Sequence, residues 1–559
     1  MNQARYIIGI DLGTTNCAVT YIDTHEADII LHPLMIPQQI SATETAKFKT
    51  LPSFVYFPIK DENKAQNEPI VGIYAREQSL LQPDRVISSS KSWLCHNKVD
   101  RRSGILPWHG AEDIEPLSPV QASSLLIQHM KKSWDKQFPN DDFTKQQIII
   151  TVPASFDETA RALTAEAIEL AGIKNVSLLE EPQAAFYAWL YHNEENWKEK
   201  LDKHQHVLVC DIGGGTSDFS LIGIQHQDHD LVLQRIAVGE HLLLGGDNLD
   251  IALAYFMEPQ FSQTRNLNPK DWGKLISQCR DAKENLFQKN SPSTWPIALA
   301  SSGKSIVSNT IKKNVSKEEA SKLFLEGFLP NQNFEISVLN QQTGFQEFGL
   351  PYSTESSITK HLANFLKKSL ADEQIPTAIL FNGGFFEAPL FKERIISILN
   401  QWFQLTMTEL HATALDLAVS QGAAYYGLAK HGRIKKIEGG LPRATFIGVV
   451  DKTGKPMALC LAPLGMEENT KIKINDFNFH LRVNMPVEFP IFSTKGMAQI
   501  KPGDLIETKG LTQGVPIRSF LKTGKKNKSK AKDIEVFLQC EFSALGTLEI
   551  FCHEVNGDR

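Results

Sequence analysis

The sequence predicts an α/β protein in which two related lobes are followed by a small β-rich domain. Tyr6–Thr15 (YIIGIDLGTT) and Val207–Thr216 (VLVCDIGGGT) both run from an apolar strand through an aspartate into a Gly/Thr turn, about 200 residues apart. Helical patterns lie between and after these segments. After about Lys430 they give way to short alternating stretches. At 559 residues, the chain is long enough for about four compact units.

Each Gly/Thr turn is followed by alternating apolar residues, at Cys17–Ile22 and at Phe219–Ile224. This pattern predicts a second strand that folds back as a hairpin, with the turn at the strand tip. Further strands are expected at Ile148–Val152 and at Ala378–Asn382, the latter ending in a glycine turn. Helices are expected over Ser123–Trp134, Glu158–Ala171 with Gly172 as C-cap, most of Asp250–Phe328, and Asp416–Leu428.

The C-terminal part predicts a compact β domain over residues 444–559, joined by a linker over 431–443. Its strand-like stretches are Lys471–Ile474, Phe477–Val483, Glu535–Phe542 and Gly546–Cys552. The basic run Leu521–Lys532 is interpreted as a solvated loop between strands rather than as a surface for an acidic partner.

Composition narrows the class of protein. A net charge of -6 and 42% hydrophobic residues are typical of a globular protein and disfavour disorder and a nucleic-acid-binding surface. The apolar runs are too short to cross a bilayer, and the N-terminus lacks a secretory pattern, so we expect a cytoplasmic protein. The seven cysteines form no C-x-x-C pair, which argues against disulfides and zinc.

The two Gly/Thr turns predict a site that binds phosphate groups. A strand-tip turn of Gly and Thr gathers backbone N–H groups and hydroxyls that can hold phosphate oxygens. Asp11, Asp211 and Asp218 would bring carboxylates nearby, where they can hold Mg²⁺ through water and orient an attacking water. One such turn is equally explained by an ordinary hairpin, whereas the second copy and the third glycine turn favour a polyphosphate site.

Six motifs in this order resemble one family. They are IGIDLGTTN (8–16), TVPASFDETAR (151–161), EEPQAA (180–185), DIGGGTSDFS (211–220), LGGDNLD (244–250) and NGG (382–384). Together they resemble the DnaK-type seventy-kilodalton heat-shock chaperones over residues 1–430, and the chain looks like a divergent, bacterial-like member. The resemblance implies a two-lobed, actin-like ATPase domain whose four subdomains are residues 1–45 with 117–195, 46–116, 196–245 with 375–430, and 246–374.

The resemblance also implies roles for individual residues. Lys91, Glu181, Asp211 and Thr216 match catalytic positions, and Asp11, Asp211 and Asp218 match the carboxylates around Mg²⁺ and accompanying K⁺. By spacing alone, Lys91 is as well explained as a surface lysine. Pro153 and Arg161 match an allosteric switch, with a strand-ending proline and a surface arginine as the alternative. The positions that match ATP/ADP binding are Gly13, Thr14, Thr15, Asn16, Gly213, Gly214, Gly215, Thr216, Gly245, Gly246, Lys283, Gly383, Gly384, Phe385 and Asp416.

The chain departs from the family pattern at the adenine positions. Glu284 and Glu387 stand where the family stacks arginines, and a carboxylate cannot provide cation–π stacking. We therefore expect weaker nucleotide binding, with Phe385 as an alternative stacking face. The apolar-acidic linker and the helical lid of the family are also missing, and the β domain resembles the peptide-binding subdomain only weakly.

The function expected from this resemblance is an ATP-dependent, chaperone-like activity. A weak ATPase would convert ATP to ADP and phosphate and gate the binding of unfolded or extended peptide segments by the β domain. A J-domain co-chaperone and a nucleotide exchange factor are implied as partners, with no nucleic acid or membrane. The alternatives are a nucleotide-binding exchange factor or scaffold with little hydrolysis, and, less favoured, a sugar kinase of the same superfamily.

Overall fold

A computed structural model of the chain gives a mixed α/β protein with several sheets. Two compact units form, Met1–Ser155 with Leu163–Ile437, and Phe156–Ala162 with Glu438–Arg559. Within the described residues, no helix has both the length and the apolar character needed to cross a membrane. The structure describes residues 4–59, 68–96, 99–227, 230–240, 242–262, 267–300, 310–335, 346–347, 350–351, 355–370, 375–437, 440–441, 443–450, 454–467, 470–483, 486–494, 500–514, 516–520, 532–543 and 548–555.

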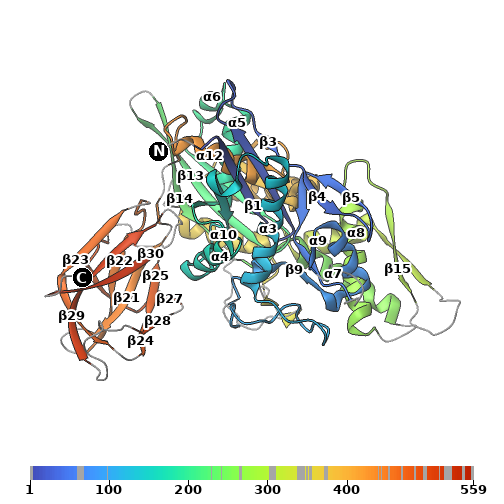
Figure 1. The fold of residues 1–559 in the computed structure, drawn as a ribbon. Coiled ribbons are helices and arrows are strands. Elements are labelled where there is room, and N and C mark those ends of the chain that lie inside the picture. Colours follow the sequence, from blue (N-terminus) through green and yellow to red (C-terminus); the bar gives the residue numbers. More distant parts are fainter. Residues whose placement is uncertain are drawn as a thin grey trace. The chain divides into compact units, whose positions relative to one another are not determined.

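The first sheet has the strand order β11-β10-β1-β2-β3, with β6 also paired to β2. Two of its strands, β1 and β3, are labelled in Figure 1. Strands β1 and β2 form the predicted hairpin, with Leu12 opposite Cys17. On its other side β1 runs parallel to β10, which runs parallel to β11. The strands are β1 (Tyr6–Leu12), β2 (Asn16–Asp23), β3 (His32–Pro33), β6 (Thr50–Pro52), β10 (Gln147–Val152) and β11 (Val176–Glu180).

The second sheet repeats this arrangement, in the order β14-β13-β12-β19-β20. Strands β12 and β13 form the second predicted hairpin, with Ile212 opposite Ser217, and β12, β19 and β20 run parallel. The internal sequence similarity therefore marks two sheets with the same strand directions around an aspartate-ended central strand. The strands are β12 (His206–Ile212), β13 (Ser217–Gln227), β14 (Asp230–Val238), β19 (Ala378–Asn382) and β20 (Thr408–Leu410).

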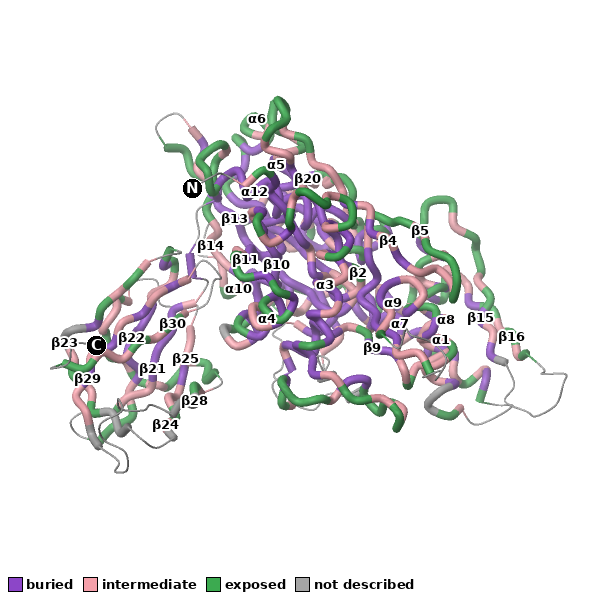
Figure 2. The backbone as a smooth tube through the Cα atoms, in the orientation of Figure 1, coloured by how far each residue is buried: buried purple, intermediate pink, exposed green. Residues whose placement is uncertain are grey.

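Two helices, α5 (Glu181–His192) and α12 (Ala418–Ala429), share one core with strands of both sheets. A Cβ atom on Gly422 would lie 1.6 Å from the carbonyl oxygen of Ala184, and one on Gly9 would lie 2.2 Å from that of Ser420. These glycines let α12 lie directly on α5 and on β1, because any side chain there would collide with backbone. Figure 2 shows buried residues concentrated in this part of the unit.

The remaining elements of the first unit surround the two sheets. The segment expected to be mostly helical also contains the hairpin β15–β16, in which Trp295 lies opposite Val315 and Leu299 opposite Ile311. The helices are α1 (Ile73–Leu81), α2 (Ser90–Trp93), α3 (Pro119–Gln137), α4 (Glu158–Leu170), α6 (Trp197–Leu201), α7 (Gly246–Ser262), α8 (Pro269–Leu286), α9 (Lys317–Gly327), α10 (Ile358–Ser369), α11 (Pro389–Phe403), η1 (Pro83–Arg85), η2 (Phe143–Lys145) and η3 (Gly384–Glu387). The further strands are β4 (Ile36–Gln39), β5 (Thr45–Phe48), β7 (Phe54–Tyr56), β8 (Ile70–Val71), β9 (Val86–Ser88), β15 (Thr294–Ala300), β16 (Thr310–Ser316), β17 (Gln346–Glu347) and β18 (Leu350–Pro351).

In the second unit, the described residues from Ala444 onward form strands. A five-stranded sheet (β26-β22-β21-β25-β27) and a three-stranded sheet (β23-β29-β30) contribute to one apolar cluster. The two stretches expected at 471–483 merge into the single strand β23, which has a register shift between Ile474 and Phe479. The basic run, apart from Lys532, lies outside the described residues. The strands are β21 (Ala444–Val450), β22 (Pro456–Ala462), β23 (Lys471–Val483), β24 (Pro486–Phe489), β25 (Ile491–Thr494), β26 (Leu505–Glu507), β27 (Thr512–Gln513), β28 (Ile517–Phe520), β29 (Lys532–Phe542) and β30 (Leu548–Glu554).

Candidate functional site

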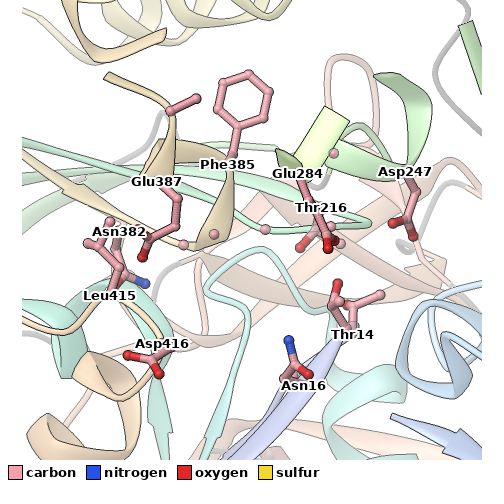
Figure 3. A pocket seen from close by; sticks show the side chains of 18 of the residues that line it. Thr14, Asn16, Thr216, Asp247, Glu284, Asn382, Phe385, Glu387, Leu415 and Asp416 are labelled. Atoms are coloured by element: carbon pink, nitrogen blue, oxygen red, sulfur yellow. The ribbon is translucent and has the colours of Figure 1, made fainter. Parts of the chain in front are cut away.

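The two hairpin turns meet at one cavity of about 670 Å³ in the first unit. Figure 3 shows Thr14 and Asn16 on one side of it, Thr216 and Asp247 across from them, and Glu387 and Asp416 further along. Most of the site residues expected from the sequence line this cavity: Asp11, Gly13, Thr14, Thr15, Asn16, Lys91, Glu181, Asp211, Gly213, Gly214, Thr216, Gly246, Lys283, Gly383, Gly384, Phe385 and Asp416.

Backbone hydrogen bonds hold both turns in place. In the second turn Gly213 N–H donates to the carbonyl of Thr216 at 3.0 Å, and Asp247 N–H donates to the carbonyl of Gly214 at 2.7 Å. In the first turn the carbonyl of Gly13 accepts from Ser53 Oγ at 2.7 Å. These bonds satisfy carbonyl oxygens, so the remaining polar groups of the turns are free to face a ligand.

Four carboxylates and one lysine lie together at the base of the cavity; Lys91, Glu181, Asp211 and Asp218 are buried, and Asp11 is partly buried. Lys91 Nζ donates to Glu181 Oε1, and both side chains are nearly inaccessible. Burial, followed by the charge of Glu181, raises the pKa of Asp11 to about 7. Burial also raises the pKa of Asp211 well above its usual range, with Glu181 and Asp218 adding to the shift. The negative charge exceeds the positive charge here, so the site favours a cation.

Polar atoms at this end of the cavity lack partners within the part of the chain that the structure describes. They are Thr15 Oγ1, Asp211 Oδ2 and Asn382 Oδ1, although Asn382 Nδ2 does donate to Asp211 Oδ1 at 3.0 Å. Buried groups left unpaired are costly in free energy, which indicates that a polar ligand completes them. No group of three or more His, Cys, Asp or Glu among the described residues is placed to hold a metal by itself. Mg²⁺ fits this arrangement, because it usually keeps several waters and binds one or two carboxylates together with substrate phosphates.

The other end of the cavity is aromatic and acidic. Glu284 at the end of α8 and Glu387 in η3 both line it and are exposed. Phe385 also lines it, but only 6% of the residue is exposed, and its ring stacks on Phe391 at 4.4 Å between centroids. One face of Phe385 is therefore already occupied by the protein.

Five predicted residues do not line the cavity. Gly215 lies within the second turn, where an added Cβ would be 2.7 Å from Thr14 Cγ2, and an added Cβ on Gly245 would meet the carbonyl oxygens of Gly213 and Gly214. Asp218 pairs with Asp211 across the β12–β13 ladder and is buried. Pro153 is buried directly after β10, and Arg161 on α4 donates from Nε to the carbonyl of Phe156 at 3.3 Å.

Several lining residues were missed by sequence reasoning, among them Arg76, Asp247, Arg280 and Asn382. Asp247 and Asn382 belong to motifs already identified, and Arg280 stands one helical turn before Glu284, so spacing alone could have found these three. Arg76 carries no such signal. It comes from α1, whose packing against α8 depends on the tertiary fold.

The comparison with known families agrees with this geometry. A family model described as Hsp70 protein matches residues 7–333, which include both Gly/Thr turns and the segments between them. This match implies an actin-like ATPase fold and nucleotide binding, usually with Mg²⁺, and suggests an ATP-dependent chaperone function. Because the matched segment covers more than half of the chain, the protein belongs to the Hsp70 family.

Proposed function

We propose that this chain is an ATP-dependent, chaperone-like protein that binds ATP in the described cavity and hydrolyses it to ADP and phosphate. The observation that supports this most strongly is the buried acidic cluster around Lys91, placed between two Gly/Thr turns and carrying unpartnered polar atoms. This combination suits a polyphosphate with a bound cation. The cation offsets the negative charge of the carboxylates and of the phosphates, and the phosphate oxygens accept from polar groups of the two turns.

In this proposal the two turns hold the phosphates through backbone N–H groups and the hydroxyls of Thr14, Thr15 and Thr216. Mg²⁺ held by Asp11, Asp211 and Asp218, mostly through water, would neutralise phosphate charge; K⁺ is a further candidate there. Lys91 stabilises charge that develops on the transferred phosphate. Asp211 Oδ2, which has no protein partner in the described residues, is placed to orient the attacking water, with Glu181 as the second candidate.

The wider layout is proposed as well. Residues 1–430 would form two lobes of two subdomains each, followed by the linker 431–443 and a β-rich domain over 444–559 that binds unfolded or extended peptide segments. Pairing of strand edges with the peptide backbone would be the binding mode. Pro153 and Arg161 would couple nucleotide state to peptide binding, assisted in the cytoplasm by a J-domain co-chaperone and an exchange factor.

Steady-state phosphate release tests this function. The wild type should release phosphate from ATP, whereas Asp211→Asn and Lys91→Ala should lose roughly 10²- to 10³-fold in turnover. Asp28→Asn, at an exposed carboxylate outside the cavity, is the matched control and should leave turnover unchanged. Turnover that is equal in all four proteins would refute the proposal.

A second candidate function is a nucleotide-binding exchange factor or scaffold with little hydrolysis. It is favoured by the exposed carboxylates Glu284 and Glu387 at the mouth of the cavity, which differ from a cationic base pocket. Bound nucleotide without turnover, together with faster exchange on another chaperone, would support this candidate over the first. A sugar kinase would instead transfer phosphate to a sugar in the same assay.

A further inference from the structure

Arg280 on helix α8 lines the cavity one helical turn before Glu284, whose carboxylate cannot provide cation–π stacking on a base. Arg280 and Glu284 are four residues apart and therefore lie on the same face of the helix, and both line the cavity. We propose that Arg280 supplies the flat cationic surface that contacts the nucleobase, a role that neither Glu284 nor Glu387 can fill. This inference rests on the proposed nucleotide-binding function and extends it to a residue that the sequence motifs do not mark.

Two aspartates fix the orientation of Arg280. Its Nε donates to Asp250 Oδ2 at 3.0 Å, and its Nη2 donates to Asp247 Oδ1 at 3.0 Å. The Asp250 side chain is completely buried, and the Arg280 side chain is 23% exposed. Two hydrogen bonds along one edge hold the plane of the group, so its position costs little entropy when a ligand arrives.

The balanced charge around Arg280 favours contact with the nucleobase rather than with the phosphates. Asp250 also pairs with Lys283 Nζ at 2.6 Å, so two aspartates balance two cations. A balanced cluster attracts a polyphosphate weakly, whereas a guanidinium whose edge is occupied still offers its face to an aromatic ring. In the described part of the chain, Arg280 makes no cation–ring contact with the protein, although Lys317 does over Phe287.

Other cations in the cavity are less suited to this role. Lys91 pairs with Glu181 at the end of the cavity formed by the two Gly/Thr turns, and Lys283 and Lys289 carry ammonium groups, which are not planar. Arg76 also has a planar guanidinium, but it lies on α1 and is exposed, and among the residues that the structure describes no carboxylate accepts a hydrogen bond from it. Arg280 is thus the planar cation whose orientation is already set before a ligand binds.

The test separates base contact from phosphate contact. Dissociation constants are measured by isothermal titration with Mg²⁺ for ATP and for tripolyphosphate, which has no base. Arg280→Lys keeps the charge that pairs with Asp247 and Asp250 but removes the flat face. We expect it to weaken ATP binding roughly 3- to 30-fold and to leave tripolyphosphate binding unchanged. The matched control is Arg5→Lys, because Arg5 also pairs with two aspartates, Asp23 and Asp141, but lies outside the cavity.

Equal weakening of both ligands, or no weakening of either, would overturn the inference. Circular dichroism and the unfolding temperature check that Arg280→Lys folds. Arg280→Gln serves as a second variant and should weaken ATP binding more than tripolyphosphate binding, because the lost charge affects both ligands whereas the lost flat face affects ATP alone. If neither variant folds, the wild type still provides a test. ATP that binds no more tightly than tripolyphosphate would show that the base adds no affinity, which would overturn the inference. A wild type that binds neither ligand would instead refute the proposed nucleotide site itself.

Discussion

Replacing Lys91 by methionine should destabilise the protein when metal and nucleotide are absent. Lys91 and Glu181 expose only 6% and 10% of their side chains. Burial lowers the pKa of the lysine, but the charges of Glu181, Asp11 and Asp211 outweigh this effect and raise it. Removal of one partner from a buried pair costs about 3–5 kcal/mol. For a unit of this size, with an unfolding entropy of roughly 2 cal/mol/K per residue, we expect the unfolding temperature to fall by about 3 to 6 °C.

The assay is thermal unfolding followed by intrinsic fluorescence in EDTA at pH 5 and at pH 8. Because the pKa of Asp11 is raised to about 7, this carboxyl is protonated at pH 5 and needs less compensation, so the deficit of Lys91→Met should shrink there. Adding Glu181→Gln should recover part of the loss by removing a charge. Lys131→Met, which breaks the exposed pair with Asp135, should cost less than about 1 kcal/mol. If Lys91→Met is as stable as the wild type at pH 8, or if the double variant is no better than the single one, the reasoning fails.

Three further outcomes are expected. In EDTA without nucleotide, the stability of the wild type relative to Asp11→Asn should fall as the pH rises from about 4 to 7, because Asp11, with its pKa raised to about 7, binds more protons in the folded than in the unfolded state; a rise of this difference in a pH series of unfolding temperatures would contradict this. Asp211→Asn should abolish the Mg²⁺-dependent part of ATP affinity measured by titration calorimetry, and unchanged Mg²⁺ dependence would remove the metal role assigned to this carboxylate. Gly422→Ala should destabilise by several kcal/mol in denaturant unfolding, because its Cβ would meet the Ala184 carbonyl at 1.6 Å, whereas Gly327→Ala, with open space around it, should not.

The end of the cavity formed by the two Gly/Thr turns is the proposed phosphate end. Much of it could be predicted from the sequence, because local patterns determine it. A strand that ends in aspartate and a Gly/Thr turn is a short, contiguous signal, and its repetition at Asp11 and Asp211 gave two sheets with the same strand order. The turns then meet because both lie at the tips of central strands. Lys91 was identified only through the family resemblance, since its burial and its pairing with Glu181 join residues 90 positions apart.

The rest depends on contacts between distant segments, which local patterns do not encode. The hairpin β15–β16 was not predicted within the mostly helical segment, since its flanks α8 and α9 carry strong helical spacing and the short apolar runs of the strands fit either period. Arg76 enters the cavity only because α1 packs near α8, a contact with no local signature. Phe385 lines the cavity as expected, but the sequence did not show that one face of its ring packs against Phe391.

The two ends of the cavity bear on different parts of the proposed function, one on hydrolysis and the other on nucleotide affinity. At the phosphate end, the turns, the carboxylates and Lys91 have the elements that phosphoryl transfer requires, so this end bears on whether ATP is hydrolysed. At the proposed base end, the carboxylates Glu284 and Glu387 cannot stack on a base, and Arg280 is the residue that we propose to do so, so this end bears on how tightly and how selectively a nucleotide would be held. Under this proposal, tight binding and turnover would vary independently. A chain with normal chemistry and weak base recognition would respond to nucleotide concentration rather than remain saturated, because a ligand controls a conformational equilibrium only over the range in which its binding site is partly filled.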